Sequence, residues 1–330
     1  MSAVLVWVET TEGRVRKPSL EALTAGRQWA DALGLPLWGV VLGAETSSEV
    51  SAIAGEYGAE KLIRILSPEL RSFVVNAYAR ALSALVREKN ISYVILPQSY
   101  DGKAVAPLLA IWTDAALFSG ITQIPEKEGK GFRARRIAYS NKGIEWVYTE
   151  HLPLIVTTKA NSFIPTKSPR KWVEEDFAFT PDARDLRAKP VGVEKVTTDK
   201  IPLTEAEVVV SAGRGLKGPE NWKIIEELAQ VLGAATACSK PVADVGWRPH
   251  HEHVGQTGIQ ISPNLYIAVG ISGAIQHLAG VASSKNIVVI NNDPEAPFFK
   301  VADYGIVGDA FEVVPRLTEA IRNYKAQHSS

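Results

Sequence analysis

The sequence predicts an α/β protein of two domains, each built on a mainly parallel sheet. Apolar strand-like runs alternate with helical stretches in both halves, which is typical of parallel sheets joined by right-handed crossovers. A proline-rich, charged stretch separates the halves. The length of 330 residues also suits two domains of ordinary size.

The first half, residues 1–165, is expected to form the N-terminal domain. Its first strand is predicted at 3–8, and a helix follows over 19–33, with Ser19 as the N-cap and Gly34 as the stop. Further helices are predicted at 72–89 and from Lys103 onward. Further strands are predicted at 37–42, 61–65, 92–97, 133–139, 144–148 and 154–159.

Residues 166–204 are expected to link the domains, and residues 205–330 to form the second one. Five prolines and crowded charges occur between Ser162 and Pro202, including the acidic run at 174–176, so we expect this segment to pack on a surface. In the second domain, strands are predicted at 207–211, 265–269, 287–290 and 304–307, and helices at 219–232, 274–281 and 311–324.

The bulk composition excludes several classes of protein. Lys plus Arg and Asp plus Glu number 36 each, and this balance disfavours a nonspecific nucleic-acid binder. Cys238 is the only cysteine, so neither a disulfide framework nor a multi-cysteine metal site can form within the chain. We see no membrane-span window and no signal-like N-terminal region, so we expect a cytoplasmic protein.

The run from Leu265 to Gly280 carries the strongest functional signal. An apolar strand leads into a turn of small residues, Gly270, Ser272 and Gly273, and then into a helix. The N-terminus of a helix exposes backbone N–H groups and attracts anions. Because His277 follows directly, the pattern predicts a phosphate-bearing ligand with a histidine beside it.

Other turns at predicted strand ends are weaker signals. Residues 213–218 fit a GxGxxG pattern, but no acidic residue follows at the expected distance, so the turn either contacts a ligand through Arg214 and Lys217 or carries two solvated charges. Residues 254–258 and 290–294 and Asp309 could each contact a nucleotide or simply form turns.

Two polar segments are more often structural. The histidines at 250, 251 and 253 match no familiar metal-ligand spacing, so a polar loop is the favoured interpretation. The strand-to-helix loop at 101–107 could contact a nucleotide, but we expect it to shape the edge of the first domain.

In combination, these motifs closely resemble the alpha subunits of electron transfer flavoproteins. The resemblance rests on the motifs at 265–280, 211–216, 254–258 and 293–307 with Asn291, in the family's order. The first 165 residues fit the family's nucleotide-hydrolase-like domain by general pattern only. The resemblance implies two Rossmann-like domains, the C-terminal one binding FAD, and a beta-subunit partner that carries AMP or, in bifurcating members, a second FAD.

The resemblance also implies roles for individual residues. Arg214, Ser239 and Lys240 would contact the cofactor, with Lys240 against the isoalloxazine. Val254, Gly255, Gln256 and Thr257 would line the ring, with Thr257 near N5. Ser272, Gly273, Ala274, Ile275 and Gln276 would present backbone and side-chain groups, and His277 would reach the pyrimidine carbonyl. Asn291 and Asp309 would hold the adenosine side.

The chemistry expected of such a site is electron transfer. One-electron reduction of a flavin places negative charge near N1 and the C2 carbonyl, which a cationic or donating His277 would stabilise. One departure matters, because the family usually has Arg where this chain has Lys240. Lysine keeps the charge but loses the planar, stacking guanidinium, so the flavin potential is expected to differ.

The leading hypothesis is an electron carrier that takes electrons from dehydrogenases and passes them to a quinone-linked oxidoreductase, with fatty-acid β-oxidation as one setting. A close alternative is the alpha subunit of a bifurcating complex that oxidises NADH. A more distant one is a stand-alone NAD-dependent enzyme, which the missing ribose-binding carboxylate disfavours.

Overall fold

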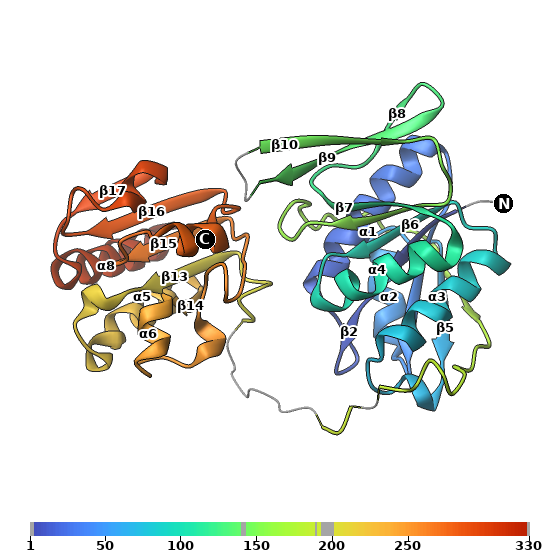
Figure 1. Cartoon of the computed structure of the whole chain (residues 1–330), viewed down its shortest axis with the longest axis horizontal. Helices are drawn as coiled ribbons and strands as arrows, with labels where there is room; N and C mark the ends of the chain where they lie inside the picture. Colours follow the sequence, from blue (N-terminus) through green and yellow to red (C-terminus); the bar gives the residue numbers. More distant parts are fainter. Residues whose placement is uncertain (1–2, 140–142, 189, 193–200, 329–330) are drawn as a thin grey trace. The chain divides into compact units, whose positions relative to one another are not determined.

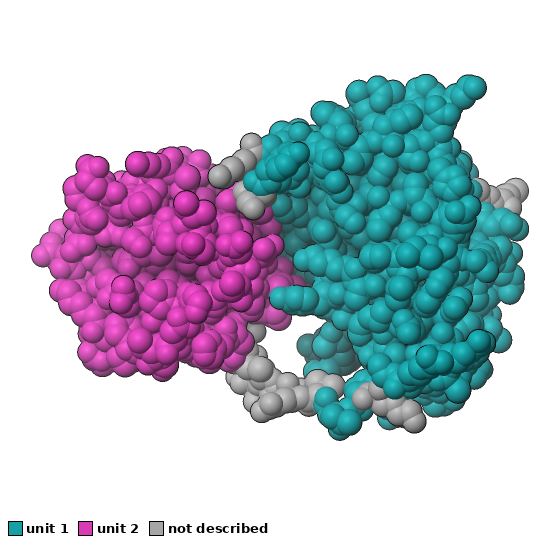
Figure 2. Space-filling model, in the orientation of Figure 1, with its two compact units in different colours: residues 1–195 teal, residues 196–330 magenta. Residues whose placement is uncertain are grey.

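The computed structural model describes residues 3–139, 143–188, 190–192 and 201–328, and the chain divides into two compact units. Unit 1 comprises residues 1–195 and unit 2 residues 196–330 (Figure 2). The division falls inside the segment expected to be the linker. Both units combine helices with mostly parallel strands, and this confirms the predicted fold class.

Unit 1 is built on a ten-stranded sheet (Figure 1). The strands of this unit are β1 (Val4–Trp7), β2 (Thr10–Thr11), β3 (Arg14–Val15), β4 (Leu37–Gly43), β5 (Lys61–Leu66), β6 (Tyr93–Pro97), β7 (Ala116–Ile121), β8 (Glu126–Glu128), β9 (Gly131–Ala138), β10 (Gly143–Thr149), β11 (Leu154–Thr158) and β12 (Val173–Asp176). The order is β10-β9-β7-β11-β6-β1-β4-β5-β12, with β8 beside β9, while β2 and β3 form a separate hairpin. The pairs from β7 to β12 are parallel, and those of β8, β9 and β10 are antiparallel.

Helices cover both faces of this sheet, and β1 shows why its residues are apolar throughout. The helices are α1 (Lys17–Leu33), α2 (Ser48–Glu56), α3 (Val75–Glu88) and α4 (Tyr100–Thr113), with a 3₁₀ turn η1 (Pro68–Leu70). Leu5 and Trp7 enter the core that contains α3 and α4, whereas Val4 and Val6 enter the core that contains α1 and α2. Successive strand residues face opposite sides, so a strand between two cores must be apolar at every position.

The start of α1 differs from the prediction, whereas its end agrees. Ser19 was expected as the N-cap, but it lies inside the helix, where its hydroxyl accepts a hydrogen bond from the Glu9 backbone N–H at 2.8 Å. The N-cap is Arg16, and Pro18 stands in the first turn, where proline needs no hydrogen-bond partner. Gly34 ends the helix with a φ of 64°, a conformation that glycine adopts without strain.

The acidic run in the expected linker is part of the first sheet. It forms strand β12, which pairs in parallel with β5. Glu175 accepts a 2.6 Å hydrogen bond from Lys61 and forms a 2.6 Å ion pair with Lys89, and both contacts lower the pKa of the Glu175 carboxyl. Arg64 contacts the neighbouring Asp176 at 2.7 Å. Acidic side chains here match basic ones on the strand they join, so the segment packs against unit 1.

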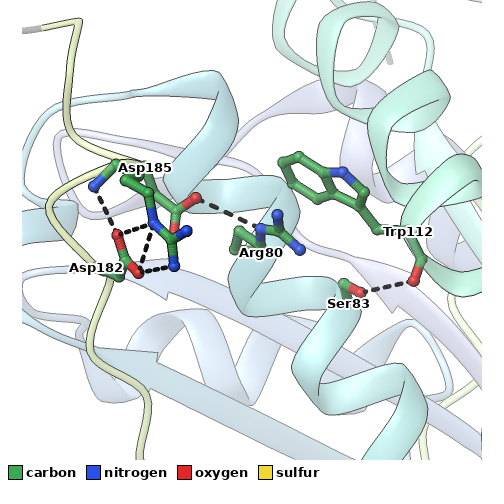
Figure 3. Close-up of polar contacts among 6 residues, drawn as sticks. Arg80, Ser83, Trp112, Asp182 and Asp185 are labelled. Atoms are coloured by element: carbon green, nitrogen blue, oxygen red, sulfur yellow. Dashed lines mark hydrogen bonds and ion pairs between the residues drawn. The ribbon is translucent and has the colours of Figure 1, made fainter.

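The chain beyond β12 is also held against the rest of unit 1, by Arg80 of α3. Its guanidinium lies 3.9 Å from the centroid of the Trp112 ring and 3.4 Å from a carboxylate oxygen of Asp185 (Figure 3). Asp182 pairs with Arg184 beside this contact, which orders the turn that carries Asp185.

Unit 2 contains a five-stranded, fully parallel sheet of order β14-β13-β15-β16-β17. The strands are β13 (Val208–Ala212), β14 (Ala235–Cys238), β15 (Leu265–Val269), β16 (Asn286–Asn291) and β17 (Tyr304–Val307). The helices are α5 (Lys223–Leu232), α6 (Lys240–Asp244), α7 (Ile275–Val281) and α8 (Ala310–His328), with 3₁₀ turns η2 (Arg214–Leu216), η3 (Pro219–Trp222), η4 (His250–Glu252) and η5 (Pro297–Val301).

The connections of unit 2 create a crevice in the sheet. The chain passes from β13 to β14 on one side and then crosses to β15 on the other side of β13. Ligands in open parallel sheets bind at the carboxyl ends of strands where the strand order reverses in this way. In the part of the chain that the structure describes, no helix is both long and apolar enough to span a bilayer.

The packing of the segment before β12 can be tested at Gly55 in α2. A Cβ added there would lie 2.0 Å from Cδ1 of Trp172, so Gly55→Ala should displace the indole and lower the free energy of unfolding by roughly 1–3 kcal/mol. Gly192→Ala is the matched control, because among the described residues no atom beyond its chain neighbours lies within 4 Å of its new methyl group. Equal urea midpoints for the two variants would contradict the packing.

Candidate functional site

A cavity of about 450 Å³ lies at the carboxyl edge of the unit 2 sheet. Residues that follow β13, β14, β15 and β16 line it, together with the loop at 253–257 and the start of α7. The cavity therefore occupies the crevice that the strand order creates. It is formed entirely by unit 2.

Two glycine turns touch directly at the base of the cavity. A Cβ on Gly213 would lie 2.3 Å from the carbonyl oxygen of Gly270, and one on Gly215 would lie 2.7 Å from the Gly270 Cα. The Gly215 N–H donates to the Gly270 carbonyl at 3.1 Å, which joins the ends of β13 and β15. Gly270 has a φ of 59°. The glycines at 213 and 215 thus serve the close approach of two turns, which explains a GxG pattern without its dinucleotide partner residue.

A second glycine pair closes the cavity wall. A Cβ on Gly280 of α7 would lie 2.5 Å from both the N and the Cα of Gly255. Beside this contact, the Gln256 N–H donates to the Gln276 carbonyl at 2.7 Å. These two contacts fix the loop at 254–258 against α7.

The cavity brings together all but three of the predicted site residues. Those that line it are Arg214, Ser239, Lys240, Val254, Gly255, Gln256, Thr257, Ser272, Ala274, Gln276, His277 and Asn291. Gly273, Ile275 and Asp309 are not among the lining residues. Gly273 packs against Phe298, Ile275 is exposed, and the Asp309 carboxylate accepts a 2.8 Å hydrogen bond from the Phe311 N–H at the start of α8.

His277 is one of two buried polar side chains in the predicted set, the other being Ser239. Only 7% of the surface of His277 is exposed, and its Nε2 lies 2.7 Å from the hydroxyl oxygen of Tyr266. Its Nδ1 is buried without a hydrogen-bond partner in the described chain. Burial lowers the pKa of His277 to about 4, and His253 nearby adds to the effect, while the Val254 backbone opposes it. From the sequence, His277 could have been either a cation or a neutral hydrogen-bond donor. With this pKa the side chain is neutral at neutral pH and can act only through hydrogen bonds.

The positive charge of the site lies at its exposed margin instead. Lys240 begins α6, and its ammonium contacts the two carboxylate oxygens of Asp244 at 2.8 and 3.0 Å. About half of each side chain is exposed. Arg214 is also exposed. An anionic ligand would therefore meet its cations near solvent, whereas the neutral His277 is buried.

Asn291 shapes the cavity through its own side-chain bonds. Its Nδ2 donates to the Ile271 carbonyl at 3.0 Å, and its Oδ1 accepts from the Asp293 N–H at 3.1 Å. Both ends of the amide are thus engaged in holding turns. Its contact with adenosine remains a prediction.

The histidine-rich loop contributes one residue that the sequence did not single out. The side chains of His250 and His251 are exposed, whereas His253 lines the cavity. Burial and the nearby Lys240 lower the pKa of His253. Glu252 is buried and accepts hydrogen bonds from Arg248 at 2.6 and 2.7 Å. No cluster of three or more metal-ligating side chains occurs in the described residues. The only available signal for His253 was its position next to Val254.

Comparison with known proteins assigns the family. Residues 202–282 match the family model for the electron transfer flavoprotein FAD-binding domain, and residues 4–200 match that for the electron transfer flavoprotein domain. The chain belongs to the electron transfer flavoprotein alpha subunit family. FAD is the cofactor of this family's C-terminal domain, and both the predicted family and the predicted cofactor are confirmed.

Curated relatives match over nearly the whole chain. The electron transfer flavoprotein subunit alpha of Bacillus subtilis is 37% identical, covering 97% of each chain. Protein FixB of Clostridium saccharobutylicum is 35% identical, covering 95% of this chain and 94% of its own. The LctC subunit of a lactate dehydrogenase (NAD(+),ferredoxin) of Acetobacterium woodii is 30% identical, covering 96% of this chain and 76% of its own.

The residues of the cavity suit FAD. The buried Nδ1 of His277 lacks a partner that a carbonyl of a bound ring would supply. Arg214 and Lys240 offer positive charge to phosphates, and Gln256 and Thr257 offer hydrogen bonds to a heteroatom-rich ring.

The Gly255–Gly280 contact predicts the effect of one methyl group. Gly280→Ala forces the methyl against backbone atoms that cannot rotate away, so the unfolding free energy should fall by roughly 1–3 kcal/mol and FAD should be retained less well. Gly308→Ala is the control, because its methyl would meet only side-chain carbons. Full FAD content in Gly280→Ala after gel filtration would contradict the contact.

The buried, neutral state of His277 predicts a pH dependence of stability. Its pKa of about 4 in the folded chain lies below the ordinary 6.5, so between these values the unfolded chain binds a proton that the folded chain does not. Stability should therefore fall as the pH drops through this window, by roughly 3 kcal/mol in total. Urea unfolding at pH 7 and pH 5 should show a smaller loss for His277→Gln than for wild type. The exposed-site control, His251→Gln, should behave as wild type, and an equal loss in all three proteins would refute the burial argument.

Proposed function

We propose that this chain is the FAD-carrying subunit of a heterodimeric electron transfer flavoprotein. Its partner would be a beta subunit that carries AMP. The complex would accept electrons from dehydrogenases, those of fatty-acid β-oxidation among them, and pass them to a quinone-linked oxidoreductase in the cytoplasm. Family membership and near full-length similarity to curated alpha subunits support this proposal.

The observation that carries the proposal is the neutral, buried His277 in a cavity whose cations lie at the rim. FAD supplies the electron-accepting ring when bound. In the proposed site, Gln256 and Thr257 orient that ring, and His277 donates a hydrogen bond to its pyrimidine edge, where negative charge builds up on reduction. Lys240 and Arg214 contact either the phosphates of FAD or its ring. The carboxylate of Asp244 forms an ion pair with Lys240 and so partly neutralises its positive charge.

A second candidate is the alpha subunit of a bifurcating complex that oxidises NADH. The similarity to LctC, a subunit of an enzyme named for both NAD⁺ and ferredoxin, favours it. The two candidates differ in cofactor content, because a bifurcating partner carries a second FAD in place of AMP.

Counting flavins distinguishes the candidates. We expect the purified heterodimer to be yellow and to release one FAD and one AMP on denaturation, as quantified by absorbance and chromatography. Two FAD and no AMP would favour the bifurcating complex, and a colourless complex without FAD would refute both.

The role of His277 predicts a shift in flavin potential. His277→Ala should keep most of its FAD but lower the potential for the first electron by roughly 20–60 mV, since one hydrogen bond contributes about 0.5–1.5 kcal/mol. Stepwise reductive titration with a reference dye measures the shift. His251→Ala, whose side chain is exposed, should leave the potential unchanged. Identical titrations for His277→Ala and wild type would rule out the role.

A further inference from the structure

Three aromatic rings pack together behind the cavity wall. Tyr266 of β15 stacks on Phe298 with 6.2 Å between centroids, and His277 meets Phe298 edge-on at 5.8 Å. Phe298 can approach this closely because its neighbour is Gly273, where a Cβ would lie 2.6 Å from the Phe298 backbone nitrogen. This packing fixes the plane of the His277 ring, so the direction in which each ring nitrogen points is fixed as well.

The hydrogen bond between Tyr266 and His277 has a definite direction. The Tyr266 side chain is fully buried, and burial raises its pKa far above the ordinary value, so the hydroxyl keeps its proton. The Ser211 hydroxyl is near enough to lower that pKa, but its oxygen makes no hydrogen bond in the described chain. Among the described residues, the Tyr266 hydroxyl therefore donates its proton to the Nε2 of His277.

The alternative direction leaves two groups unsatisfied. If Nε2 carried the proton and donated to Tyr266, the phenolic O–H would have only the Ser211 hydroxyl near it, which makes no hydrogen bond in the described chain, and the Nδ1 lone pair would be buried without a donor. Buried polar groups in native proteins are nearly always paired. With Tyr266 as donor, the Nδ1–H has the Val254 backbone near it and makes no hydrogen bond in the described chain, and it belongs to a side chain that lines the cavity.

We propose that Tyr266 is a positioning residue that selects the Nδ1–H tautomer of His277 and thereby makes it a hydrogen-bond donor to the ligand of the cavity. This inference rests on the proposed function for the identity of the ligand, but the tautomer itself is a property of the chain. A neutral imidazole offers one donor and one acceptor, so whichever nitrogen Tyr266 occupies decides which of the two the ligand meets. A donor suits a carbonyl that gains negative charge, and an acceptor would repel it.

Nitrogen NMR measures the tautomer directly. In the purified protein labelled with ¹⁵N-histidine, His277 is assigned by the signals missing from His277→Asn among the six histidines of the chain. We expect a protonated Nδ1 and an unprotonated Nε2 at pH 7, both with the native flavin and after its removal. Protonation on Nε2 in wild type would overturn the proposal, and this result needs no variant that folds.

Tyr266→Phe removes the hydroxyl and keeps the stacked ring. We expect the Nε2–H form of His277 to become populated and the first reduction potential of the flavin to fall. The fall should disappear when the same change is made in a His277→Ala background, because Tyr266 acts through His277. Ser211→Ala removes the neighbouring buried hydroxyl, whose oxygen makes no hydrogen bond in the described chain, and is the matched control, which should keep the wild-type tautomer.

The outcomes separate the two claims. Potential shifts of Tyr266→Phe and His277→Ala that add independently, or a tautomer unchanged in Tyr266→Phe, would overturn the role of Tyr266. A correct tautomer in a protein that holds no FAD would leave this role intact and refute the proposed function instead.

Discussion

The cavity depends on backbone segments that touch with no side chain between them. Gly213 and Gly215 meet Gly270 at one side, and Gly255 meets Gly280 at the other. Without these contacts, the turns after β13 and β15 and the loop at 254–258 would be held apart by at least a Cβ layer. Arg214, Ser272, Gln256 and Thr257 belong to these same segments, so their positions follow from the glycine contacts.

The electrostatic design follows from where the chain places its charges. Lys240, Asp244 and Arg214 lie where water reaches them, so keeping them charged costs little. His277 lies where water does not reach, and it responds by remaining neutral. A buried neutral donor can stabilise a developing negative charge without the desolvation cost that a buried cation would carry. This arrangement fits a cofactor that changes charge during its cycle while the protein stays rigid.

The sequence predicted the alternating strands well, because residues such as Leu5 and Val6 must be apolar on both faces of a covered sheet. Strand β14 was missed, because its Ala and Thr residues are too small and polar to form an apolar run. Strand β12 was not recognised either, because its acidic side chains are stabilised in a sheet only by ion pairs with Lys61 and Arg64. Those partners lie more than 100 residues away, and local patterns carry no information about them.

The candidate site was predictable where small residues follow strands, and less so where tertiary packing assigns the role. In the sequence, Tyr266 looked like one more apolar strand residue. The hydrogen bond of its hydroxyl to His277, eleven residues later and on a helix, is formed only in the folded chain. The charge state of His277 likewise depends on burial by Phe298 and the 253–255 loop, which no local pattern reveals.

If the glycine-lined cavity holds the isoalloxazine of FAD beside a neutral His277, a crystal structure of the purified heterodimer at neutral pH should show the flavin ring in the cavity. Its pyrimidine edge should lie within hydrogen-bonding distance of His277, and Thr257 should face the ring. A flavin bound elsewhere, or His277 turned away from it, would show that this cavity is not the flavin site.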